Sequence, residues 1–307
     1  MIAYHGRNVS RRQWQFTVAV LACALIAGLG YSPILMAETH RYQASLHEAD
    51  WQVSASVFEC RLFQTIPGFG EAEFVHQAGE ALEFRIDSYA DVVDGGDLVL
   101  RSEPPPWNFK RQAVVLAELE AVQNPARVAF DTMMARRLIS EMLVGMVPTL
   151  SGRSSFAHDQ LINVGLSPLR FKAAYNSYQH CAGDLLPVNY EQVGRSTLFW
   201  PSGSRQLTAE ARQLLDNIVL YSRADERVVG FEVDSFTDTA GETRENLLLS
   251  EERAFLVTNY LISQGVDPET IATRAHGERE EFLVVNPERT AADRNRNRRV
   301  NIVMLRR

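Results

Sequence analysis

The sequence contains none of the short motifs that usually carry catalysis or nucleotide binding. It has no Gly-x-Ser-x-Gly nucleophile elbow, no phosphate-binding loop and no dinucleotide-binding glycine pattern. Its seven histidines include no His-x-x-x-His pair, and its three cysteines are far apart, so no ligand spacing indicates a zinc site. These absences predict a protein without catalytic residues, metal or cofactor, and they argue against an enzyme.

Positive charge is also scarce. The formal net charge is −7 at pH 7, and the first 37 residues contain Arg7, Arg11 and Arg12 but no acidic residue, so the remainder is more acidic still. A nucleic-acid-binding protein usually carries a positive excess, and we therefore expect no nucleic-acid partner. A composition of 46% hydrophobic and 22% charged residues is globular and excludes a wholly disordered chain.

Only one stretch of the chain is apolar for long enough to approach the length of a membrane span. Residues 16–29 carry no charge, follow a basic segment and precede small residues. This order predicts a secretory signal peptide over residues 1–37, cut after Ala37, and a periplasmic mature protein. Two alternatives stay open: an uncleaved anchor, because residues 16–37 are nearly long enough to span a bilayer, and a lipoprotein that begins at Cys23.

Two cysteines, Cys60 and Cys181, remain after removal of the signal peptide. An even count in an oxidising compartment predicts one disulfide between them. It would close a loop of roughly 120 residues, for which the chain-entropy model gives about 4–5 kcal/mol of stabilisation. The alternative is two separate buried thiols.

Residues 38–187 have the pattern of a β-rich domain, a barrel or a sandwich. Apolar and polar residues alternate over 81–87, which predicts a strand with one buried face. Pro104, Pro105 and Pro106 exclude a central strand at that point. Helices are expected at 131–143 and 168–181.

Residues 188–307 alternate strands and helices, which predicts an α/β sandwich and an α+β class for the whole chain. Thr208 is expected to cap one helix and Ser250 to cap the next, which Gly265 ends. A strand is expected over 227–233, and residues 286–298 form a polar stretch before the last strand.

An acid and an arginine lie close together in this second domain. Asp238 follows a strand, and Arg253 comes three residues after Ser250, so we expect it in the first turn of a helix. Both side chains are predicted at the surface, at one edge of the sheet. An aspartate attracts an ammonium group and an arginine holds a carboxylate in its planar fork, so the pair suits a zwitterionic ligand. Backbone N–H groups at the helix start would add donors.

The residues around this pair resemble those of the OmpA-like peptidoglycan-binding family. The resemblance is carried by Thr237-Asp238, Gly241, Asn246, Leu249-Ser250, Arg253-Ala254, Gly265-Val266, Gly277-Glu278 and Asn297-Arg298-Arg299-Val300. It implies that Asp238 and Arg253 bind the diaminopimelate of peptidoglycan stem peptides, with Thr237, Asn246 and Leu249 beside them. Ser235-Phe236 replaces the usual Gly-His, and Arg298 is expected to be a structural ion-pair residue.

The first domain resembles the N-terminal domain of the MotY family of flagellar motor T-ring proteins. The residues concerned are Trp51, Glu59-Cys60-Arg61-Leu62, Ile66-Pro67-Gly68-Phe69-Gly70 and Pro104-Pro105-Pro106-Trp107. This implies a non-enzymatic structural component that joins the basal body, the stator complex and a MotX-like protein to the cell wall.

Three alternatives stay open on the sequence. The first is a general OmpA-like or Pal-like anchor between the outer membrane and peptidoglycan. The second is the stator B subunit, against which residues 16–37 argue because they contain no ion-binding Asp. The third is an enzyme that remodels the wall.

Overall fold

The computed structural model describes residues 39–307, except residues 95, 109, 123–125 and 158–159. The predicted signal peptide therefore lies outside the described residues. Among the described residues, no helix is both long enough and apolar enough to cross a membrane.

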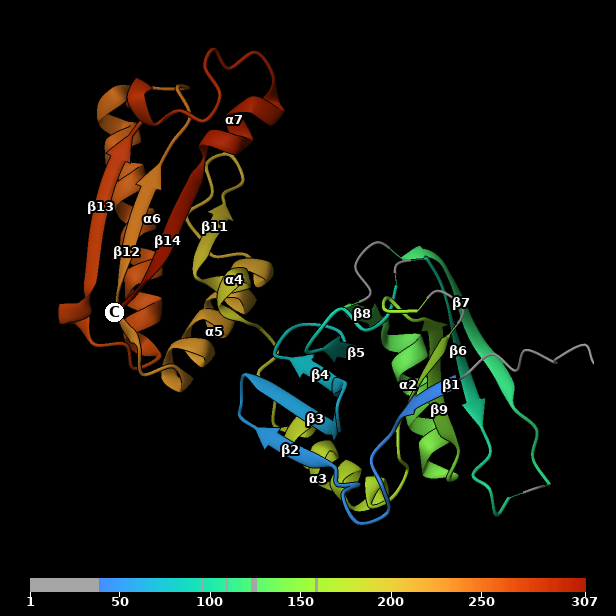
Figure 1. The fold of residues 1–307 in the computed structure, drawn as a ribbon. Helices are drawn as coiled ribbons and strands as arrows, with labels where there is room; N and C mark the ends of the chain where they lie inside the picture. Colours follow the sequence, from blue (N-terminus) through green and yellow to red (C-terminus); the bar gives the residue numbers. More distant parts are fainter. Residues whose placement is uncertain (1–38, 95, 109, 123–125, 158–159) are drawn as a thin grey trace, which may run out of the picture. The chain divides into compact units, whose positions relative to one another are not determined.

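Residues 39–187 form two five-stranded sheets (Figure 1). One sheet has the order β2-β3-β4-β5-β8, with strands Gln52–Ala55, Glu59–Ile66, Gly70–Gln77, Glu83–Ser88 and Arg127–Phe130. The other has the order β1-β10-β9-β6-β7, with strands Thr39–Tyr42, Leu161–Gly165, Val147–Arg153, Gly96–Glu103 and Val114–Val122. Both sheets are open over the described residues, so the sandwich fits and the barrel does not.

Two helices complete this region. Helix α2, Thr132–Leu143, agrees with the predicted helix, and Asp131 caps it by accepting from the Met134 backbone N–H. Helix α3, Phe171–Gly183, starts three residues later than predicted. It packs on β2 and β3, whereas α2 contacts β5 of one sheet and β9 of the other.

The core of residues 39–187 is rich in aromatic rings. Trp51 lies with its ring centroid 5.0 Å from that of Phe171 and 5.9 Å from that of Phe74, and Phe74 in turn lies 4.7 Å from Phe84. The Trp51 indole is satisfied because its Nε1 donates to the Ser167 carbonyl oxygen at 2.8 Å. These contacts tie β2, β4, β5 and α3 into one core.

The predicted disulfide between Cys60 and Cys181 is present, with the two Cα atoms 5.9 Å apart. Cys60 lies on β3 and is fully buried, while Cys181 lies near the end of α3. The bond therefore fastens the last helix of this region to its sheet across 121 residues of sequence.

Residues 188–307 form a four-stranded sheet of order β11-β14-β12-β13, with strands Arg195–Phe199, Arg299–Arg306, Val228–Phe236 and Ile271–Gly277. β12 and β13 are parallel, and the other pairs are antiparallel. Helices α5, Ala209–Ala224, and α6, Thr243–Ser263, pack against the strands (Figure 1). The short helix α4 covers Tyr190–Val193, and Thr208 caps α5 as predicted.

One expectation for this region was wrong, and one helix was not predicted. Helix α6 begins at Thr243 rather than after Ser250, because residues 243–249 contain good helix formers and neither glycine nor proline. The Ser250 hydroxyl instead donates to the Leu247 carbonyl and accepts from the Gly277 N–H, which joins the helix to β13. The polar stretch 286–298 contains helix α7, Ala291–Asn297, started by a capping box between Thr290 and Asp293.

Candidate functional site

Asp238 lies just past the end of β12 and is buried, with 7% of its surface exposed. Its Oδ2 accepts a hydrogen bond from Arg298 Nη1 at 2.6 Å. The loop that carries it is fixed to the neighbouring strand, because the Thr237 N–H donates to the Gly277 carbonyl at 2.9 Å. The expectation of a surface aspartate was wrong: Asp238 is a buried member of an ion pair.

Arg253 lies in the middle of α6 and is fully buried. Because the helix starts at Thr243, Arg253 is not in a first turn, and helix N–H donors do not surround it as predicted. Its Nε and Nη2 donate to the Ser204 carbonyl oxygen at 3.2 and 3.0 Å, whereas its Nη1 has no partner among the described residues. Burial, followed by the nearby charge of Arg298, lowers the pKa of Arg253 to about 10, which leaves it charged at neutral pH.

Two residues outside the predicted set complete the site. Arg298 donates through Nε to the Trp200 carbonyl at 3.1 Å while its Nη1 holds Asp238, so the expected ion-pair role is confirmed. The Arg253 guanidinium lies 5.6 Å from the centroid of the Trp200 ring, within the range of a cation–π contact. The sequence could indicate Arg298 through its Asn-Arg-Arg context, but it gave no signal for Trp200.

The charges and donors of this cluster do not balance internally. Two guanidinium groups, of Arg253 and Arg298, lie near one carboxylate, Asp238, which forms its ion pair with Arg298. Of the buried polar atoms without a partner among the described residues, three belong to this cluster: Arg253 Nη1, Trp200 Nε1 and Thr237 Oγ1. Buried polar atoms are normally paired, and unpaired ones often mark a position where a ligand binds. The cluster is chemically suited to an anionic group such as a carboxylate.

The other predicted ligand residues have different roles. Asn246 is buried, and its Nδ2 donates to the Ala240 carbonyl at 3.0 Å and to the Glu278 carboxylate. Asn246 therefore holds the loop after Asp238 in place. Gly241 lies in that loop with φ +104°, a conformation that favours glycine. Leu249 is half-buried on α6, and the structure gives it no polar role.

Phe236 and His276 stack beside the site. Their ring centroids are 4.8 Å apart with an interplanar angle of 10°, and the Arg299 guanidinium lies 4.1 Å from the Phe236 centroid. His276 Nε2 contacts Asp234 Oδ1 at 2.7 Å. This packing gives His276 a structural role. It also shows how the Phe236 ring fits at the position where the OmpA-like pattern has histidine. Among the described residues, no cluster of three acidic, histidine or cysteine side chains could hold a metal ion.

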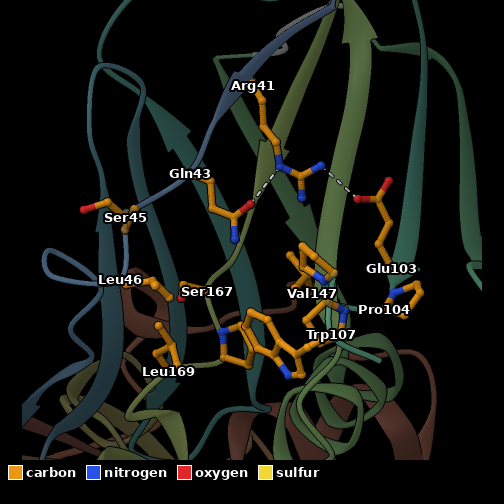
Figure 2. A pocket seen from close by; sticks show the side chains of 14 residues that line it. Arg41, Gln43, Ser45, Leu46, Glu103, Pro104, Trp107, Val147, Ser167 and Leu169 are labelled. Carbon is orange, nitrogen blue, oxygen red and sulfur yellow. Dashed lines mark hydrogen bonds and ion pairs between the residues drawn. The ribbon is translucent and has the colours of Figure 1, made fainter. Parts of the chain in front are cut away.

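A second candidate site lies in residues 39–187, as a cavity of about 520 Å³ (Figure 2). At one end, Arg41 Nη1 donates to Glu103 Oε2 at 2.9 Å and Arg41 Nε donates to Gln43 Oε1 at 2.7 Å. The other end is apolar. Trp107 and Leu46 border it, and each has 64% of its surface exposed. The sequence indicated Pro104–Pro106 as a break in the strand pattern and Pro104–Trp107 as part of a family resemblance, but it gave no signal for Leu46.

Two family models match the chain. Residues 42–187 match the MotY N-terminal domain, and residues 199–298 match the OmpA family. The chain joins a MotY N-terminal domain to an OmpA-family domain. Both resemblances predicted from the sequence are thereby confirmed.

Individual relatives agree with these two matches. The chain is 28% identical over 294 residues to the sodium-type flagellar protein MotY of Vibrio parahaemolyticus, which covers 94% of this chain and 97% of that protein. It is 36% identical over 119 residues to outer membrane protein A of Bordetella avium, 38% of this chain and 58% of that protein. The solved peptidoglycan-associated lipoprotein of Burkholderia pseudomallei matches at 22% identity and a TM-score of 0.33, covering 36% of this chain and 89% of that one.

Proposed function

We propose that the protein is a non-enzymatic periplasmic component of the bacterial flagellar motor that anchors the basal-body T ring and the stator to peptidoglycan. Residues 188–307 bind the wall, and residues 38–187 carry motor assembly. The wall-binding half rests on the buried Arg253 in the region that matches the OmpA family. Its Nη1 has no partner within the described part of the chain, and the Asp238 charge lies nearby.

The ligand is the zwitterionic end of diaminopimelate in a stem peptide. Its carboxylate takes the Arg253 fork, and its ammonium group faces the Asp238 carboxylate. One exposed charge contact gains little against lost hydration. Two opposite contacts in a buried, preformed site gain more, because the protein groups have already lost their water.

Wall binding tests this site. We expect Asp238→Ala or Arg253→Ala to lose roughly 2–3 kcal/mol of affinity for purified peptidoglycan, the size of a charged hydrogen bond with one partner removed. Arg253→Lys should restore little, because a point charge does not reproduce the planar fork. The measurement is co-sedimentation at several protein concentrations, with circular dichroism to confirm that each variant is folded.

The matched control is Arg212→Ala, which removes an exposed arginine from α5 and should leave binding unchanged. Undiminished binding by a folded variant that carries both Asp238→Ala and Arg253→Ala would exclude this site.

The assembly half of the proposal rests on the MotY N-terminal match and on the exposed apolar rim of the cavity in Figure 2. Residues 38–187 attach to the basal body and recruit a MotX-like protein. In full-length protein, Trp107→Ala combined with Leu46→Ala should reduce localisation of a fluorescent fusion to motors and leave wall binding intact. Met133→Ala, which is 77% exposed on α2, is the control. Unchanged localisation would exclude this rim.

The second candidate function is a general OmpA-like or Pal-like envelope anchor, favoured by the match to outer membrane protein A over 119 residues. A deletion strain separates the two. The motor function predicts lost motility with normal cell shape, whereas a general anchor predicts envelope defects whether or not the cell has flagella.

A further inference from the structure

The segment between β11 and α5 covers the one guanidinium that the proposed ligand must reach. The Ser204 carbonyl oxygen accepts from both Nε and Nη2 of Arg253, and it therefore occupies the position where a ligand carboxylate would bind. Arg253 has 0% of its surface exposed, and the Trp200 ring also lies 5.6 Å from its guanidinium. No ligand of any size reaches Arg253 unless this segment moves.

The contact between the segment and Arg253 is a poor match in chemical terms. A neutral carbonyl serves a buried charge, and the Nη1 hydrogens remain unpaired within the described part of the chain. Hydrogen bonds to a charged acceptor are shorter and roughly twice as strong as those to a neutral one. A carboxylate would therefore bind the Nε and Nη2 edge more strongly than the Ser204 carbonyl does, with one oxygen for each nitrogen.

The segment is built to move. Residues 201–206 read Pro-Ser-Gly-Ser-Arg-Gln, and all but Ser204 are exposed. Gly203 adopts φ +66°, and a Cβ built on it would meet nothing within 4 Å, so no other part of the chain packs against this point. The hydrogen bonds from the Ser204 N–H to the Pro201 carbonyl and from the Gln206 N–H to Ser204 Oγ lie within the segment itself. Apart from the Ser204 carbonyl, a single ion pair fastens the segment to α6: Arg205 Nη1 lies 2.7 Å from Glu252 Oε1, with side chains 66% and 45% exposed.

We propose that residues 201–206 form a lid over the wall-binding site, closed in this structure and held by the Arg205–Glu252 latch. The ligand carboxylate replaces the Ser204 carbonyl on the Arg253 fork, and the lid opens to admit it. The proposal rests on the proposed function for the identity of the ligand, but the movement of the lid can be measured without any ligand.

The lid also makes the site selective. A stem peptide with lysine in place of diaminopimelate has the ammonium group but lacks the carboxylate on the same carbon. It has no group to exchange for the Ser204 carbonyl, so the closed state is retained. Apparent affinity falls by the fraction of protein that is open, and a ligand with no preference for the open state does not shift that fraction.

The decisive experiment measures the accessibility of Arg253 in the full mature chain. Phenylglyoxal reacts with exposed arginines, and peptide mapping by mass spectrometry gives the rate at Arg253. We expect slow labelling in the wild type. Arg205→Gln and Glu252→Gln should each accelerate labelling of Arg253 about two- to fivefold, because loss of an exposed ion pair changes an equilibrium by about that factor. Arg212→Gln on α5 is the control and should leave the rate unchanged.

The two latch variants change the local charge in opposite directions, so they separate the lid from simple electrostatics. Acceleration in both supports the lid. Unchanged rates in both, or acceleration in one and retardation in the other, would overturn it.

Calorimetry with free meso-diaminopimelate then tests the link to the ligand. Both latch variants should bind it more tightly than the wild type, by a factor similar to their gain in labelling. If labelling accelerates in both variants while neither they nor the wild type bind diaminopimelate, the lid stands and the proposed ligand is wrong. If the ligand binds equally well in all three proteins and labelling does not change, the lid is wrong and the proposed function stands.

Discussion

Residues 39–187 and residues 188–307 differ in whether they bury arginine side chains. In the first region every described arginine is exposed or half-buried, and the core is closed by aromatic rings and a disulfide. The second region buries Arg253, Arg298 and Arg299. All three belong to the group that surrounds Trp200, Phe236 and Asp238 at one end of the sheet.

The difference shows which region contains a buried charge that destabilises the fold. A buried charge destabilises a fold unless its partners satisfy it completely, and natural proteins accept such conflicts mainly at functional sites. The first region buries no unpaired charge in its described core, although the Ser151 and Tyr178 hydroxyls have no partner there. Its candidate site is a cavity with one charged and one apolar end. The second region places its conflict at the site proposed to bind the wall.

The second region also contains a buried charge whose partners are complete. Asp225 is 4% exposed, and its carboxylate accepts hydrogen bonds from Arg227, Arg306 and the Tyr221 hydroxyl. The hydrogen bond from Arg227 lowers the pKa of Asp225 well below its usual range, and the bond from Tyr221 and the charge of Arg306 lower it further. Asp225 therefore provides an internal comparison with Arg253: one buried charge fully paired, the other not.

The largest effect should come from the disulfide. Replacing Cys60 and Cys181 together by serine should lower the free energy of unfolding of residues 39–187 by about 4–5 kcal/mol, because the unfolded chain regains the entropy of a long loop. The measurement is urea denaturation of the mature protein, followed by tryptophan fluorescence and by circular dichroism. Trp51 and Trp107 report on the first region and Trp200 on the second.

The comparison between the regions predicts that this loss is confined to the first one. A transition assigned to residues 188–307 should keep its midpoint. Equal destabilisation of both regions would contradict the separation of their cores.

Asp225→Asn should have the next largest effect, about 3 kcal/mol, on the second region. Removing one partner of a buried pair leaves Arg306 near Tyr221 without its charge partner, which is the costly case. Asp216→Asn is the matched control, because Asp216 is exposed and accepts one bond from Tyr260. It should lose less than about 1 kcal/mol. Both are measured by urea denaturation of the same region.

Asp225 also makes the stability of the second region depend on pH. The pKa of Asp225 is lowered in the folded state, so its contribution is fully present above the ordinary aspartate pKa of about 3.9 and is lost as the pH falls below it. Wild-type stability of the second region should therefore decline below about pH 4, and Asp225→Asn should flatten part of that decline. A parallel decline in both proteins would show that other carboxylates cause it.

Much of this fold could be predicted from sequence, because local patterns determined it. The alternating residues of β5, the helix α2, the cap of α5 and the proline run after β6 were all predicted within a few residues. The predicted start of helix α6 is too late because a serine at position 250 resembles a helix cap. In the structure its hydroxyl instead accepts a hydrogen bond from β13. The local sequence pattern does not show which distant backbone group a hydroxyl will hydrogen-bond in the folded chain.

The candidate site was predicted only in part, for the same reason. Motif spacing identified Asp238 and Arg253, yet their burial depends on Ser204, Trp200 and Arg298, which are distant in the sequence. No periodicity in residues 200–206 indicates that a backbone carbonyl would occupy the arginine fork. Charge complementarity was therefore predicted, but the closed state of the site was not.

The smallest effect on the free energy of unfolding is expected from replacing the buried Arg253. If this arginine served only the fold, its replacement would have a large effect. Arg253→Met should change the free energy of unfolding by no more than about 1 kcal/mol. Methionine fills the volume and removes a charge whose hydrogen bonds, among the described residues, go only to the neutral Ser204 carbonyl. Arg306→Met should lose several times more, because Asp225 would be left buried with one cation fewer. Urea denaturation of the two variants side by side measures the difference. A loss above about 2 kcal/mol in Arg253→Met would make this arginine a structural residue and remove the contrast with Asp225. A small loss, together with lost wall binding, is the result expected of a charge retained for a ligand rather than for the fold.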